Sequence, residues 1–277
     1  MLKLKWKGLP WFATVLLLSC LVAASGHTAG RKLVYTPLPI EQPETVIAAN
    51  RPLVSYLEKQ LKVPIAIRYE KNYSDILQLF REGKIDIILL GPLPYVILRN
   101  SYAKAEPLVA INEADGKATY TCAMVTAFDG PSSAKQVHRS IAFSQPLSTC
   151  GHLAAGYLLD KYGVKLEALR HDYLGNQDQV ALAVVRGDYE VGTLKTVVAK
   201  KYARLTLRVI EETPAFPGFI LVANRATLTS EQIREVRGLL LGIDSKDRAA
   251  LVMGQHGFAP VLDTNYDLIR KNLKFFR

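Results

Sequence analysis

The chain has 277 residues, of which 49% are hydrophobic and 22% charged, a composition typical of a globular protein with one large domain or two small ones. Its net charge of +10 comes from lysines and arginines that are scattered along the chain rather than clustered. Because neither a zinc-ligand spacing nor a base-stacking motif accompanies them, we expect no nucleic-acid partner, no metal and no cofactor.

Residues 1–24 have the pattern of an export signal. The basic start MLKLKWK precedes an apolar run, GLPWFATVLLLSCLVAA, that is short for a spanning helix and is interrupted by Pro10. Small residues at its end favour cleavage after Ala24 or nearby. The tetrapeptide LLSC leaves an alternative open, since it resembles a lipoprotein signal that ends before an acylated Cys20.

The next part of the chain alternates between strand and helix patterns. Strands are expected at residues 32–38, 63–69 and 85–91, and helices at residues 50–61, 72–84 and 92–103. The third strand, IDIILLG, is apolar throughout, which suits a strand buried on both faces. Such alternation is the signature of a largely parallel sheet covered by helices.

A similar pattern follows Lys117. Strands are expected at residues 119–126, 140–146, 190–194, 206–214 and 218–224, with a less clear one within 166–174. Helices are expected at residues 153–163, 176–189 and 229–243, and from 247 to the C-terminus. Two similar α/β units in one exported chain suggest two lobes around a cleft.

Three loops of this arrangement are candidates for a ligand site. In open parallel sheets the ligand lies beyond the carboxyl ends of the strands, near helix N-termini. This rule selects the loop after Tyr35, the loop at Gly91-Pro92 and the loop Ser148-Thr149-Cys150-Gly151. Ser148 and Thr149 alone could simply cap a helix. Together with free backbone N–H groups they would also make an oxyanion site.

Several segments of the chain resemble one protein family. They are PLVSYLEKQLKVPI, NYSDILQLFREGKIDIILLGPLPYV, SQPLSTCG and QVALAVVRGDYEVG. The chain from about residue 32 to residue 260 is thus similar to the phosphate, phosphite and phosphonate-binding proteins of ABC importers, which are type II periplasmic binding proteins. The second and third segments are the most specific for that family, and they favour the oxyanion site over the helix cap.

The resemblance implies a set of ligand-binding residues. Relatives hold the phosphonate oxygens with a Ser-Thr-Ser-Gly loop, so that Ser148 and Thr149 match hydroxyl donors and Cys150 replaces the third hydroxyl with a weaker donor. Tyrosines of the cleft match Tyr73, Tyr95 and Tyr120. Gln177 stands where many relatives carry a phosphonate-binding histidine.

The same resemblance implies the domain organisation. The expected fold is α/β with two lobes, each a mixed sheet flanked by helices, and with the ligand in the cleft between them. Lobe one is expected to be discontinuous, with residues 30–114 plus 224–277, and lobe two to span residues 115–223. Two crossings of the chain would then form a hinge.

The expected function is that of a non-enzymatic, monomeric solute-binding protein in the periplasm. It would capture phosphite, phosphate or a simple phosphonate and deliver it to an ABC permease. Relatives that take aminoalkyl substrates place acids where this chain has Val197 and Phe219, which indicates a ligand without an amine. Membrane contact is expected only through a partner or a lipid anchor at Cys20, which would hold the chain at the outer face of the membrane.

Two alternatives remain open at this stage. In the first, the same fold senses an oxyanion, arsenite included because a thiolate is a soft ligand, and signals to a membrane histidine kinase. In the second, Cys150 is the nucleophile of an enzyme, although His152, two residues away on a helix, would point elsewhere. A Cys150→Ser change should be nearly harmless to a binder. Whether Cys150 pairs with Cys122 is not decided by the sequence.

Overall fold

The computed structural model describes residues 1–3 and 31–276. The predicted export signal, apart from its first three residues, and Cys20 therefore lie outside the described residues. No helix in the described part of the chain is long and apolar enough to cross a membrane. From Arg31 onward the chain forms one compact unit with two large sheets and a small two-stranded one.

The first large sheet has six strands in the order β13-β4-β12-β3-β1-β2. They are β1 (Leu33–Thr36), β2 (Ile65–Ile67), β3 (Ile87–Leu90), β4 (Ala105–Ile111), β12 (Ile220–Asn224) and β13 (Phe258–Ala259). Strand β1 is parallel to β2 and β3, whereas β12 runs antiparallel to both β3 and β4. The sheet is therefore mixed, and a late segment of the chain completes a sheet that an early segment begins.

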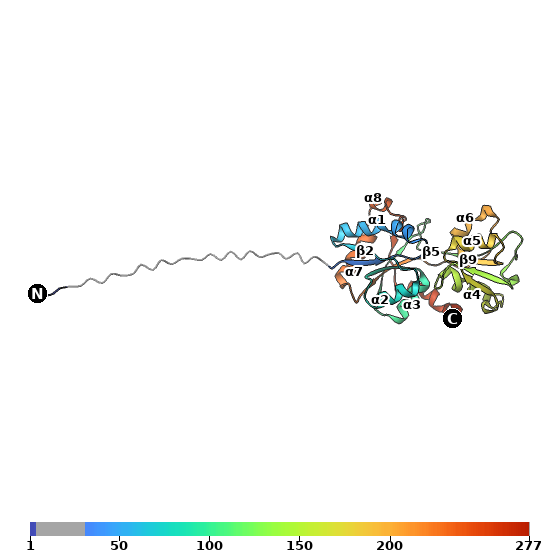
Figure 1. The fold of residues 1–277 in the computed structure, drawn as a ribbon, viewed down its shortest axis with the longest axis horizontal. Helices are drawn as coiled ribbons and strands as arrows, with labels where there is room; N and C mark the ends of the chain where they lie inside the picture. Colours follow the sequence, from blue (N-terminus) through green and yellow to red (C-terminus); the bar gives the residue numbers. More distant parts are fainter. Residues whose placement is uncertain (4–30, 277) are drawn as a thin grey trace. The chain divides into compact units, whose positions relative to one another are not determined.

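Helices cover both faces of this sheet (Figure 1). They are α1 (Pro43–Leu61), α2 (Tyr73–Arg81), α3 (Pro92–Ser101), α7 (Ser230–Leu241) and α8 (Ser245–Ala249). Strand β3 explains the two layers: Ile87 and Leu89 join the core under α1 and α7, while Ile88 and Leu90 join the core under α2 and α3. Its uninterrupted apolar sequence thus serves two faces, as predicted.

The second large sheet has five strands in the order β10-β6-β9-β7-β8. They are β6 (Cys122–Thr126), β7 (Ser140–Phe143), β8 (Arg170–Tyr173), β9 (Val191–Lys195) and β10 (Arg208–Glu212). Strand β7 is parallel to β8 and β9, and β6 is antiparallel to β9 and β10. The prediction of mixed sheets flanked by helices is thus confirmed for both.

Helices also lie on both faces of the second sheet. They are α4 (Ala154–Asp160) on one face and α5 (Gln177–Val185) with α6 (Thr196–Lys201) on the other. The two-stranded sheet pairs β5 (Thr119–Tyr120) with β11 (Phe216–Pro217). Short helical turns complete the described structure: η1 (Ala134–Gln136), η2 (Thr149–Leu153), η3 (Leu166–Ala168), η4 (Ala203–Leu205), η5 (Asp263–Tyr266) and η6 (Leu273–Phe276), with the short helix α9 (Asp267–Lys271) between the last two.

Helix α1 begins seven residues earlier than the expected start at Asn50 and contains Pro52. A helix that started at Asn50 would have Pro52 in its first turn, where proline is tolerated. However, Val46, Asn50 and Leu53 continue one buried stripe across the proline. Asn50 holds this stripe to the sheet, because its side chain donates to the Val46 carbonyl and accepts from the Tyr35 hydroxyl.

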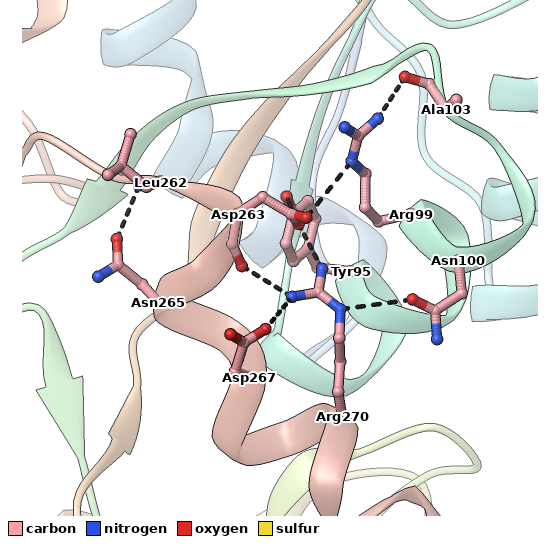
Figure 2. A network of polar contacts seen from close by, with 9 residues as sticks. All are labelled: Tyr95, Arg99, Asn100, Ala103, Leu262, Asp263, Asn265, Asp267 and Arg270. Carbon is pink, nitrogen blue, oxygen red and sulfur yellow. Dashed lines mark hydrogen bonds and ion pairs between the residues drawn. The ribbon is translucent and has the colours of Figure 1, made fainter.

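The C-terminal segment from Asp263 to Phe276 connects α3 with α4. At one end the Tyr95 hydroxyl of α3 donates to Asp263 over 2.6 Å, and Arg270 pairs with Asp263 and Asp267 (Figure 2). At the other end Phe275 lies so close to Gly156 of α4 that an added Cβ would stand 2.8 Å from the Cβ of Phe275. Helix was expected from residue 247 to the C-terminus, and this segment is indeed helical, as two short turns with the short helix α9 between them.

The Asp263 network predicts a pH-dependent contribution to stability. Burial raises the pKa of Asp263, but hydrogen bonds from Tyr95 and Arg270 outweigh it, so that the pKa of the folded state is lowered. The contribution is therefore present above the unfolded pKa of about 3.9 and is lost as the pH falls through the lower folded value. We expect Asp263→Asn to destabilise the protein at neutral pH. In denaturant unfolding its deficit should shrink below about pH 4, and a deficit that does not change with pH would contradict this account.

Candidate functional site

A cavity of about 330 Å³ lies between the two large sheets. Its walls come from the residues that follow the carboxyl ends of β1, β3, β7, β8 and β9, as expected for a ligand site of this architecture. The lining includes Tyr73, Gly91, Tyr120, Ser148, Thr149, Cys150, Gln177, Asp178, Lys195, Val197, Lys201 and Phe219. Six of the seven residues that the sequence singled out are among them, so the fold brings distant segments together here.

The loop after β7 is not an ordinary capped helix. Residues Thr149–Leu153 form a π-helical turn, η2, in which Gly151 departs from helical angles before α4 begins. Ser148 occupies the N-cap position, yet its side chain makes no capping hydrogen bond. The hydroxyl of Thr149 instead accepts a hydrogen bond of 3.0 Å from the backbone N–H of Leu93. The helix-cap interpretation of these two hydroxyls therefore finds no support in their contacts.

Backbone N–H groups of the same loop are left as donors. The amides of Ser148 and Gly151 donate to the carbonyls of Gln145 and Ser148. Within residues 31–276 the amides of Thr149 and Cys150 have no hydrogen-bond acceptor. Free N–H groups and hydroxyls on one wall of a cavity are the donors that an oxyanion requires.

Two tyrosines add hydroxyl donors to this wall. Tyr73 begins α2 and Tyr120 ends β5, so that the two tyrosines come from segments far apart in the chain. Burial raises the pKa of both phenols well above the ordinary value, and the neighbouring Tyr73 adds a smaller increase to the pKa of Tyr120. Both hydroxyls therefore stay protonated at neutral pH and can donate to an anion.

Cys150 is joined to Cys122 by a disulfide bond. This corrects the expectation of a weak S–H donor at Cys150, because a disulfide sulfur carries no proton. It also removes the thiolate that an arsenite site or a cysteine nucleophile would need. His152 lies elsewhere, with its Nδ1 at 3.2 Å from the Tyr173 hydroxyl. The sequence could not show the pairing, since the two sulfurs meet only through the fold.

Gln177 begins α5 and uses one end of its amide within the protein. Its Oε1 accepts from the backbone N–H of Lys195 over 2.9 Å, which leaves the Nε2 protons as donors. Lys195 in turn pairs with Glu113, and Lys201 pairs with Asp178. The sequence analysis did not identify Asp178 or Lys201 as lining residues. Asp178 lies just beyond the end of β8, so the rule that ligands lie beyond the ends of strands would have pointed to it.

The two positions expected to lack acids both line the cavity. Val197 is largely exposed at its rim, and Phe219 packs beside Gly91 and Thr149. An added Cβ at Gly91 would lie 3.5 Å from the Phe219 ring and 3.6 Å from the Thr149 hydroxyl. Gly91 thus keeps this corner of the cavity open. The lining still contains two acids, Asp178, which has Lys201 as its counter-ion, and Glu41, whose side chain is exposed to solvent.

Tyr95 does not lie in the cavity lining. Its ring packs edge-on against Tyr266 at 4.6 Å, and its hydroxyl is held by Asp263. Gly91 and Pro94 are the residues of this loop that line the cavity, whereas Tyr95 belongs to the buried core. We therefore do not propose Tyr95 as a ligand-binding residue.

Comparison with known proteins gives a consistent result. The family model described as "ABC transporter, phosphonate, periplasmic substrate-binding protein" matches residues 35–266. The phosphate-import protein PhnD of Mycolicibacterium smegmatis is 24% identical over 264 residues, which cover 84% of this chain and 82% of the relative. The phosphonates-binding periplasmic protein of Escherichia coli is 24% identical over 224 residues, 76% of this chain and 65% of the relative.

A solved structure shares the fold. PhnD1 from Prochlorococcus marinus, in complex with methylphosphonate, superposes with a TM-score of 0.76 at 19% identity, and the match covers 87% of this chain and 97% of the other. At this level of identity the likeness establishes the periplasmic binding protein fold.

Proposed function

The chain belongs to the periplasmic substrate-binding proteins of phosphonate ABC transporters, and on that premise we propose that it captures a compact phosphorus oxyanion: phosphite, phosphate or a simple phosphonate. Members of this family bind substrates for an ABC transporter in the periplasm and are not enzymes. The identity of the anion is the part that we propose.

The observation that carries the proposal is the loop at Ser148, Thr149 and Cys150. Two hydroxyls that cap no helix and two amides without an acceptor line one cavity. Tyr73, Tyr120 and the Gln177 amide offer further donors in the same lining. Such a set suits an anion with several oxygens, because each oxygen can accept more than one hydrogen bond.

The charges of the lining support a ligand without an amine. Lys195 and Lys201 each have a carboxylate partner, Glu113 and Asp178. Neither pair leaves a carboxylate free for a ligand ammonium, and an unpaired ammonium in a partly buried site would cost about 3–5 kcal/mol. We therefore propose phosphite, phosphate or methylphosphonate ahead of aminoalkylphosphonates.

We also propose that the ligand closes two lobes on each other. The hydrogen bond from Leu93 to Thr149 links α3, which covers the six-stranded sheet, to η2, which follows strand β7 of the five-stranded sheet. A ligand held by both sides would favour such a closed state through its differential affinity. The division at residues 30–114 plus 224–277 and 115–223, and the monomeric state, belong to this proposal. Signalling of the same closed state to a histidine kinase stays a prediction.

A thermal-shift screen tests the proposed ligand class. At a ligand concentration of about 100 times Kd, binding stabilises the folded state by about 2.7 kcal/mol. Each kcal/mol raises the Tm of a chain of this size by about 2–4 °C, so we expect a rise of about 5–10 °C with the right anion. Phosphate, phosphite and methylphosphonate are the test ligands, with sulfate and chloride as controls. The oxyanion proposal fails if none of the three phosphorus compounds shifts the Tm by more than about a degree.

A further inference from the structure

Lys195 brings an ammonium group to the cavity from the end of β9. Its Nζ lies 2.6 Å from a carboxylate oxygen of Glu113. The same nitrogen lies 4.8 Å from the ring centroid of Tyr120 and 5.0 Å from that of Phe219. The lysine side chain is only 13% exposed, so this environment surrounds most of it.

One carboxylate and two aromatic rings are the surroundings that bind an alkylammonium ion. The carboxylate supplies charge-assisted hydrogen bonding, and the rings add cation–π attraction. Glu113 does not depend on Lys195 for its backbone position, because its amide donates to the Lys117 carbonyl over 2.8 Å within a tight turn. Glu113, Tyr120 and Phe219 therefore form an ammonium site that the chain fills with its own lysine.

This ammonium site adjoins the oxyanion loop. The Phe219 ring and the Thr149 hydroxyl both lie within contact distance of one point, the place where a Cβ on Gly91 would stand. The other ring of the site, Tyr120, packs against Phe219 at a tilt of 34°, with centroids 5.6 Å apart. A ligand whose oxyanion sits at Thr149 would thus direct a short substituent toward the lysine.

We propose that Lys195 is a specificity-determining residue, which excludes aminoalkyl oxyanions by occupying the place of their ammonium group. The inference rests on the proposed function and names the ligands that the site rejects. In the wild-type protein a ligand amine would find Glu113 already paired and a like charge beside it. Without the lysine, Glu113 and the two rings would be free to receive that amine.

Titration calorimetry with methylphosphonate and 2-aminoethylphosphonate tests this on the wild-type protein and on Lys195→Ala. We expect the ratio of the two affinities to move toward the amine by at least about ten-fold in the variant, equivalent to about 1.4 kcal/mol. Lys195→Met is the matched control, because it removes the charge but fills most of the space. Its ratio should move less than that of Lys195→Ala.

A second variant identifies the carboxylate that receives the amine. In Lys195→Ala/Glu113→Gln the gain for 2-aminoethylphosphonate should disappear, whereas a gain that persists would assign the amine to another acid of the lining, Glu41 or Asp178, and overturn the proposal. An unchanged ratio in Lys195→Ala also overturns it, as does loss of both ligands by a folded variant. If the wild-type protein binds no phosphorus oxyanion at all, the proposed function itself has failed, and this inference falls with it.

Discussion

Replacing Thr149 by valine is expected to abolish most oxyanion binding while the protein still folds. Valine keeps nearly the same volume but has no hydroxyl, so an anion oxygen in the site loses a donor. An unpaired group of this kind costs about 1–3 kcal/mol, which corresponds to a rise in Kd of roughly five- to 150-fold. Calorimetry with the anion that gives the largest thermal shift measures the loss. An unchanged Kd would return Thr149 to a purely structural role.

Two control variants separate binding from stability at this position. Thr149→Val also removes the acceptor of the Leu93 amide, which is a structural loss in the ligand-free protein. Thr126 is likewise buried and donates to the Glu190 carbonyl, but it does not line the cavity. Thr126→Val should therefore lower the Tm without changing the Kd. Thr149→Ser, which keeps the hydroxyl, should retain most of the affinity.

The second large effect is expected at the disulfide bond. Cys122 and Cys150 are 28 residues apart. By lowering the entropy of the unfolded chain, a disulfide that closes a loop of this length stabilises the folded state by about 3–4 kcal/mol. Cys150→Ser, which looked nearly harmless from the sequence, should thus lower the Tm by about 6–15 °C. The lost bond also joins β6 to the oxyanion loop, so affinity should fall as well.

Reduction of the wild-type protein provides the comparison. A thiol reductant should lower its Tm toward that of Cys150→Ser and should leave the Cys122→Ser/Cys150→Ser double variant unaffected. Equal Tm values for the oxidised wild-type protein and for Cys150→Ser would show that the disulfide contributes nothing to stability.

The strongly patterned elements of this fold are readable from the sequence. The apolar run of β3 and the helix at residues 229–243, which contains α7, are both predicted from the sequence, since each pattern depends on neighbouring residues alone. Strand β4 was missed because Pro107 interrupts its pattern. In the structure Pro107 stands opposite Val222 at an irregularity of the pairing with β12, where a missing N–H does little harm. Strand β13 has two residues and offers no pattern to read.

The residues of the candidate site also differ in whether local sequence predicts their position. Ser148 and Thr149 follow a strand and precede a helix, so the rule of strand ends locates them. Whether Tyr95 faces the cavity or the core depends on Asp263, which is 168 residues away in the chain. The disulfide and the pairing of Lys195 with Glu113 are likewise products of long-range packing, and local sequence carries no signal for either.

The central claim is that a phosphorus oxyanion binds at Ser148 and Thr149, and a crystal structure of the protein with the most stabilising of phosphate, phosphite and methylphosphonate tests it most directly. We predict the phosphorus in the cavity, with anion oxygens about 2.5–3.0 Å from the Ser148 and Thr149 hydroxyls and within hydrogen-bond distance of the Thr149 and Cys150 amides. An anion bound outside the cavity, or one in the cavity that contacts neither hydroxyl, would contradict the account.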